Sequence, residues 1–97
     1  MKPEQLTQAF ERAASELGVK VRYEALSPSG VSTGGGLCKV RGEWWVMIDK
    51  KTPPADRAVI LADALARFDT ESIELPPQAQ EMLAHRRASL APRTGNA

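Results

Sequence analysis

The chain has 97 residues, of which 42% are hydrophobic and 26% are charged, and this fits one small soluble globular domain. The net charge of +1 disfavours a dedicated nucleic-acid binder, which usually carries a strong basic excess. Cys38 is the single cysteine, so no internal disulfide can form and a reducing compartment is expected. Residues 1–18 contain no long apolar run, so we expect no signal peptide, no membrane span and a cytoplasmic location.

The first predicted element is a helix over residues 3–17. Its apolar residues recur at helical spacing and form one stripe, made of Leu6, Phe10, Ala13 and Leu17. Gly18 suits the position just past the helix end, where a positive φ is common. Apolar and charged residues then alternate over residues 19–25, which predicts a half-buried strand with one solvated face. Residues 26–36 are rich in Ser and Gly and are predicted to form a mobile loop.

A hairpin that turns near Gly42 is predicted over residues 37–49. A two-residue loop would place Cys38 beside Trp45, whereas a three-residue loop would place Cys38 beside Trp44 on one purely apolar face. We prefer the three-residue loop because register follows the burial of a consistent face. The opposite face would then carry Leu37, Lys39, Arg41, Glu43, Trp45 and Met47.

A second helix is predicted over residues 54–68, with Thr52 as its cap and prolines in its first turn. Its apolar stripe is wide, so we expect it to be the most buried helix. A short extended piece follows over residues 71–75, and Pro76 and Pro77 begin a third helix.

The element order is helix, strand, strand, strand, helix, helix. This order predicts an α+β fold, in which about three helices pack against a small, mainly antiparallel, three-stranded sheet. Residues 1–88 are expected to form one domain, and residues 89–97 a flexible C-terminal tail.

The residues with catalytic or metal-binding chemistry are sparse. One Cys and one His cannot supply a closed zinc site, so we expect no metal and no cofactor. His85 follows Glu81 at the spacing of a surface helical pair. Cys38, on the expected apolar face, is predicted to be an inert core thiol. The Ser/Gly-rich loop lacks the Gly-Lys-Ser/Thr ending of a phosphate-binding loop.

The stretch ILADALARFD resembles the motif helix of ImmA/IrrE-type zinc metallopeptidases, because the helix, strand, glycine loop and strand before it follow the order of that family's core. Ala62 and Leu65 match the family's Ala-His-Glu-Leu-Gly-His motif. The resemblance places Asp63 and Arg67 at the two zinc-binding histidines, and Ala64 at the general-base glutamate. It therefore implies, at most, a metal-free relic that has lost hydrolysis.

The sequence thus predicts a non-catalytic protein-interaction or self-association module, in a small cytoplasmic protein of bacterial type, whose partner is another protein or a second copy. Tryptophan and methionine are enriched in interface cores, and the expected surface consists of Leu37, Lys39, Arg41, Trp45 and Met47. A second layer of this same chain would instead make Trp45 part of the core. The alternative is an enzyme or small-molecule binder, with a pocket near the glycine-rich loop formed by Asp49, Asp63 and Arg67. Nucleic-acid binding through Trp45 and its basic neighbours is a weaker third hypothesis.

Overall fold

The computed structural model describes residues 1–25 and 35–90. Its elements in chain order are α1 (Pro3–Leu17), β1 (Lys20–Glu24), β2 (Gly35–Val40), β3 (Glu43–Asp49), α2 (Pro54–Leu65) and α3 (Pro77–Leu90). The fold is α+β with the predicted order of elements. Within the two described ranges, no helix has the length and apolar character needed to cross a bilayer.

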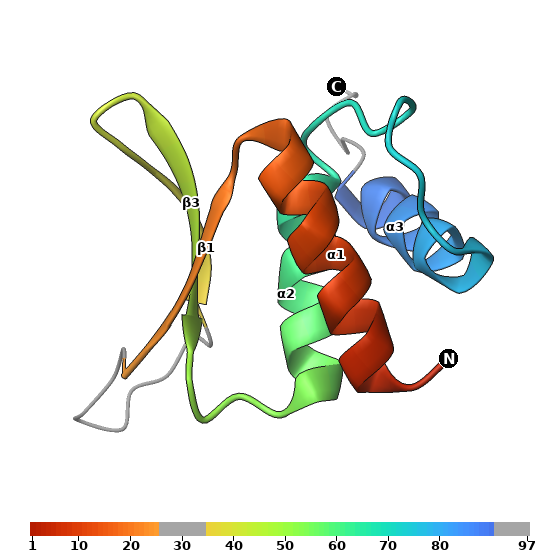
Figure 1. Ribbon diagram of the computed structural model, residues 1–97, viewed down its shortest axis with the longest axis horizontal. Coiled ribbons are helices and arrows are strands. Elements are labelled where there is room, and N and C mark those ends of the chain that lie inside the picture. Colours follow the sequence, from red (N-terminus) through yellow and green to blue (C-terminus); the bar gives the residue numbers. More distant parts are fainter. Residues whose placement is uncertain (26–34, 91–97) are drawn as a thin grey trace.

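The elements form three layers, which Figure 1 shows with the sheet edge-on at the left, α1 and α2 in the middle, and α3 beyond them. Both α1 and α2 contact the sheet, whereas α3 contacts the two helices and, in the described part of the chain, no strand. Two helices rather than three therefore cover the sheet, and they cover one face of it. Its other face carries no described helix (Figure 1).

The sheet is mixed, with the strand order β1-β3-β2. β3 is the central strand, paired parallel with β1 and antiparallel with β2. The predicted antiparallel pairing is found between β2 and β3 of the hairpin, whereas β1 and β3 are parallel. The parallel pair arises because β3, which runs in the same direction as β1, lies beside it, whereas β2 lies on the far side of β3.

The core lies between the sheet and the middle layer, and α3 closes its far side. Its largest side chains without solvent exposure are Phe10, Val46, Ile48, Leu61 and Leu65. Burial of a side chain of this size contributes about 1.5–3 kcal/mol. The hydroxyl of Thr7 also donates to the carbonyl of Pro54 at 3.1 Å, which joins α1 to the start of α2.

The helix ends follow local chemistry. Gly18 has a φ of 80°, as predicted for the residue after α1, and its N–H donates to the Ser15 carbonyl. α2 ends at Leu65 rather than residue 68, because the next turn tightens when the N–H of Phe68 donates to the Leu65 carbonyl. Thr52 does not cap α2, whose N-cap residue is Pro53.

Some predicted boundaries also move. Gly35 and Gly36 belong to β2 rather than to the expected loop, and the rest of that loop, residues 26–34, lies outside the described residues. α3 continues to Leu90, and residues 91–97 of the expected tail also lie outside them.

The hairpin has a two-residue loop, so the preferred three-residue loop is wrong. Val40 pairs with Glu43, and the two residues between them have φ values of 52° at Arg41 and 83° at Gly42. Two positive φ angles define a type I′ turn, whose twist matches that of the flanking strands. The match between turn and strand twist therefore decides the loop length, and not the burial of a purely apolar face. Cys38 consequently pairs with Trp45 and not with the apolar residues of the core.

Candidate functional site

Two surfaces around β3 contain the candidate residues. The first is the face of the sheet that no described helix covers, here called the outer face. It is formed by alternate residues of the three strands, namely Lys20, Arg22, Glu24, Cys38, Val40, Glu43, Trp45 and Met47. Trp45 is at its centre, because it pairs with Lys20 of β1 on one side and with Cys38 of β2 on the other.

Trp45 is half-buried by its own chain even though no helix of the described residues covers it. The Lys20 ammonium lies 5.2 Å from the centre of its indole ring, and the Arg22 guanidinium lies 5.5 Å from it. Cations at this distance from an indole attract its π face, by about 0.5–1 kcal/mol each when exposed. The indole Nε1 is itself buried and has no hydrogen-bond partner among the described residues. Such an unpaired donor costs about 1–3 kcal/mol.

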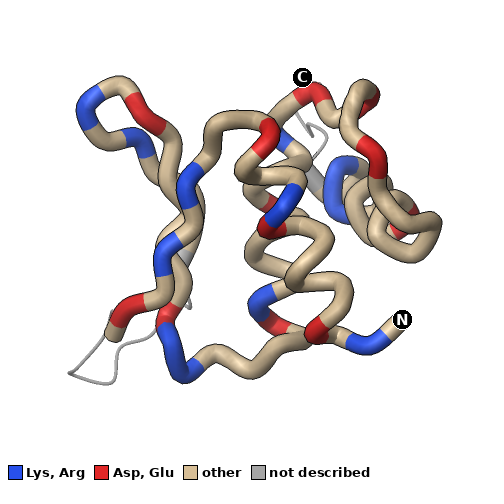
Figure 2. Tube along the Cα trace, viewed as in Figure 1, with Lys and Arg blue, Asp and Glu red and all other residues tan. Residues whose placement is uncertain are grey.

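The charges of the outer face are balanced. Lys20 forms an ion pair with Glu43 at 3.2 Å, and Arg22 forms one with Glu24 at 2.5 Å. Figure 2 shows that both β1 and the β2–β3 hairpin carry basic as well as acidic residues. Exposed pairs of this kind add little stability, about 0–1 kcal/mol. Their effect is to leave the face without a net charge that would repel a similar surface.

The second surface is an open hollow of about 550 Å³ on the helix side of the sheet, between β2 and α2. It is lined by Gly36, Leu37, Trp44, Ile60, Asp63, Ala64 and Arg67. Trp44 forms one wall and is 36% exposed. Its ring and that of Phe68 form an edge-to-face pair with centroids 5.7 Å apart, and the Lys39 ammonium lies 5.2 Å from the centre of the Trp44 ring.

The charged groups of the hollow are not equivalent. Both carboxylate oxygens of Asp63 accept hydrogen bonds from Arg86 of α3, at 2.5 and 3.2 Å. Asp63 in turn raises the pKa of Arg86 through this hydrogen bond and through its charge. In contrast, Arg67 and Lys39 form no ion pair within the described residues. Among the described residues, Arg86 therefore balances the charge of Asp63, and Arg67 is the cation that lines the hollow without an ion-pair partner.

The structure separates the five residues expected to form one interaction surface. Trp45 and Met47 lie on the outer face, whereas Leu37 and Lys39 point to the helix side, where Leu37 packs against the core. Arg41 is exposed in the turn. The separation follows from the two-residue loop, because a shift of one residue moves every side chain of β2 to the other face.

The alternative pocket is only partly assembled. Asp63 and Arg67 line the hollow together, next to the end of the glycine-rich stretch. Asp49 is not among the residues that line it. Asp49 is buried where β3 ends, and its Oδ1 accepts a hydrogen bond from the N–H of Lys51. That hydrogen bond stabilises the turn toward α2.

Four residues of these two surfaces were not predicted as site residues from the sequence, namely Lys20, Arg22, Trp44 and Ile60. The alternation of Lys20 and Arg22 with apolar residues did predict that both point away from the core. Their position beside Trp45 depends on the parallel pairing of β1 with β3, which local patterns do not specify.

Groups with nucleophilic or metal-binding chemistry are dispersed. Cys38 is half-buried on the outer face, so its expected place in the core is wrong. Within residues 1–25 and 35–90, no three His, Cys, Asp or Glu side chains come close enough together to hold a metal ion. His85 is exposed on α3.

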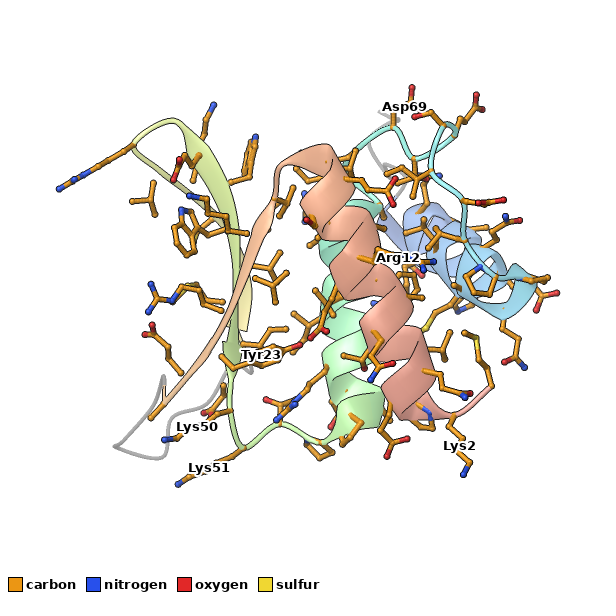
Figure 3. The ribbon with its side chains drawn as sticks, viewed as in Figure 1. Lys2, Arg12, Tyr23, Lys50, Lys51 and Asp69 are labelled. Atoms are coloured by element: carbon orange, nitrogen blue, oxygen red, sulfur yellow. The ribbon has the colours of Figure 1, made fainter. Side chains whose placement is uncertain are left out.

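One polar cluster joins the sheet to both helices of the middle layer. The hydroxyl of Tyr23 donates to the carboxylate of Glu11 on α1, and Arg57 of α2 lies 4.7 Å from the Tyr23 ring centre. Figure 3 shows Tyr23 extending from the sheet toward the helices. Burial, followed by the hydrogen bond to Glu11, raises the pKa of Tyr23 well above its usual value, and Arg57 opposes this. Arg57 also donates to the carbonyls of Thr52 and Lys50. These contacts hold β1, α1 and the start of α2 together.

Comparison with known proteins gives no relative for this chain. No model of a protein family, no curated protein and no solved structure matches it.

Proposed function

We propose that this chain is a non-catalytic protein-interaction module, and that its outer face packs against a second copy of the chain. The observation that carries the proposal is the outer face itself, where Trp45 and Met47 lie on a sheet surface that no described helix covers. A sheet with apolar side chains on its second face invites a partner. Trp and Met are residue types that interface cores favour.

The half-buried ring of Trp45 supports the same conclusion. Its Nε1 is buried by the chain itself without an acceptor among the described residues, so a partner would contact the exposed part of the ring and not this N–H. Tryptophans of this kind, which combine a large apolar area with one polar atom, are frequent at binding hot spots.

A second copy is the partner that the charges favour. Lys20 and Glu43 pair with each other, as do Arg22 and Glu24, so the outer face presents both signs without a net excess. Two copies related by a two-fold axis can therefore meet at this face without like-charge repulsion, and each basic residue can face an acidic one.

The non-catalytic character rests on the residues at the motif positions of the resemblance. The oxygens of Asp63 are occupied by Arg86, Arg67 is a cation that cannot ligate zinc, and Ala64 is buried and cannot accept a proton. A relationship to ImmA/IrrE-type metallopeptidases remains part of this proposal, as a shared scaffold without the hydrolytic reaction.

The test is the mass of the chain in solution as a function of its concentration, measured by light scattering on wild type, Trp45→Ala and Trp44→Ala. We expect a dimer in the wild type, at least a tenfold weaker dimer for Trp45→Ala because hot-spot truncations cost about 2 kcal/mol or more, and little change for Trp44→Ala. A wild type that stays monomeric up to about 1 mM, and a Trp45→Ala variant that only loses stability, would show that Trp45 serves the fold alone.

A further inference from the structure

The two edges of the sheet differ in how well they resist pairing with another strand. β1 carries Lys20, Arg22 and Glu24, and charged side chains on an edge strand oppose such pairing. β2 has the sequence GGLCKV, with one charged residue, no proline, and a continuous register with β3 that leaves no room for a bulge. In the described part of the chain, no segment pairs with the open side of β2. It is the less protected edge.

The backbone groups on this open side follow from the hairpin register. In a two-residue hairpin, the pair that flanks the turn exchanges backbone hydrogen bonds, and bonded and non-bonded pairs then alternate along the strands. Val40 and Glu43 flank the turn, so Val40, Cys38 and Gly36 direct their backbone groups to β3. The N–H and C=O groups of Leu37 and Lys39 therefore face away from β3, on the side where no described strand pairs with β2.

The hollow lies where the side chains of that further strand would point. Leu37 and Lys39 both have their side chains on the helix side of the sheet, and Leu37 lines the hollow. Residues that lie opposite them on an added strand would have their side chains on the same side. At about 550 Å³, the hollow is within the usual range for ligand pockets, roughly 300–1,000 Å³.

The positive charge at the hollow favours an acidic side chain on the added strand. Because Asp63 and Arg86 neutralise each other, the hollow is left with the positive charge of Arg67, two residues after α2, and of Lys39, whose ammonium lies over Trp44. A carboxylate next to Arg67 would gain a charge-assisted hydrogen bond, and its aliphatic part would contact Leu37, Trp44 and Ile60.

We propose that the free edge of β2 binds an extended segment of a partner protein as a fourth strand, and that an acidic side chain of this segment occupies the hollow beside Arg67. Strand addition of this kind takes affinity from backbone hydrogen bonds and specificity from a pocket for alternate side chains. This binding goes beyond the proposed function, because it uses the helix side and the β2 edge, whereas self-association uses the outer face.

The test uses a displayed library of seven-residue peptides with Glu, Gln or Lys fixed at the centre and the other positions randomised. We expect peptides with central Glu to bind wild type about tenfold more tightly than their Gln counterparts, the range expected for one charge-assisted hydrogen bond. Arg67→Gln should abolish this preference and Arg67→Lys should restore part of it. The matched control is Arg41→Gln, which removes an equal charge from the exposed turn and should keep the preference.

Strand addition is tested separately with the best peptide, methylated on the backbone nitrogens of either set of alternate residues. One set should lose binding by tenfold or more and the other should not, since only one set faces β2. Equal effects of the two sets, an unchanged Glu preference in Arg67→Gln, or no peptide that binds more tightly than about 1 mM would each overturn the proposal. Trp45→Ala should bind the peptide like wild type, so failure of self-association and failure of strand addition give different results.

Discussion

The two faces of the sheet are built from alternate residues of the same three strands, yet they have different roles. On the helix side, Val46 and Ile48 are completely buried against the middle layer. On the outer face, Trp45 and Met47 are half-buried, and the long side chains of Lys20 and Arg22 on the neighbouring strand lie against Trp45. Apolar character alone therefore does not distinguish core from surface in β3. The position of the helices does.

The two adjacent tryptophans show the same difference at a single step of the chain. Trp44 meets an aromatic neighbour, Phe68, edge to face and forms a wall of the hollow. Trp45 meets cations in place of aromatic rings, and its Nε1 has no acceptor within the described residues. Burying an unpaired donor costs free energy of folding. Trp45, on the outer face, is therefore the tryptophan that suggests a role other than stabilising the fold.

The largest expected loss of stability distinguishes two neighbouring residues of β3, Ile48 on the helix side and Met47 on the outer face. Ile48→Ala should lower the free energy of unfolding by about 3 kcal/mol, because it opens a cavity in a core that cannot fully collapse. Urea denaturation followed by circular dichroism measures this change.

Met47→Ala is the matched control on the outer face. Met47 is half-buried and no described helix covers it, so its truncation should cost less than about 1 kcal/mol. Equal losses for Ile48→Ala and Met47→Ala would mean that the outer face is covered as well as the helix side, and the contrast between the faces would disappear.

A smaller effect concerns a polar group on the helix side. Tyr23→Phe removes the hydrogen bond to Glu11 and should lower stability by about 1 kcal/mol near pH 7. Because the folded chain raises the pKa of Tyr23, this tyrosine keeps its proton when the same group in the unfolded chain has begun to lose it. The stabilisation is complete below about pH 10, the ordinary tyrosine pKa, and is lost as the pH rises further.

Urea denaturation of wild type and Tyr23→Phe between neutral and strongly alkaline pH checks the sign. The difference between them should shrink above the ordinary tyrosine pKa. Glu24→Gln, which breaks the exposed pair with Arg22 on the outer face, should change stability little and in a salt-dependent way. A difference between wild type and Tyr23→Phe that grows with pH would contradict the direction of the pKa shift.

Local patterns in the sequence were sufficient to predict the elements. The stripe containing Phe10 and Ala13 predicted α1, the positive φ of Gly18 was expected, and the alternation over residues 19–25 matched β1 to within one residue at each end. The fact that Trp44 and Trp45 face opposite sides followed from the period of a strand alone. These features depend on neighbours in the chain, which the sequence displays directly.

The arrangement of the surfaces could not be predicted in the same way. Lys20 reaches Trp45, and Arg86 reaches Asp63, across 25 and 23 residues of chain, respectively, through strand and helix packing that no local pattern contains. The hairpin register failed for a different reason. Burial of a consistent face favoured three loop residues, whereas the backbone of Arg41 and Gly42 adopts the two-residue turn whose twist suits the strands.

The smallest expected effect tests the turn that decides which residues lie on which face. Arg41 has a positive φ that costs most residues free energy but that Asn tolerates, so Arg41→Asn should raise stability by about 0.5 kcal/mol. Gly42→Ala should lower it by about 1 kcal/mol through the backbone alone, since an added Cβ meets no atom within 4 Å. Thermal unfolding of both variants measures these shifts. If Arg41→Asn destabilised the chain and Gly42→Ala did not, the turn would not be of type I′. The two-residue register would then fail, and with it the pairing of Cys38 with Trp45 on the outer face.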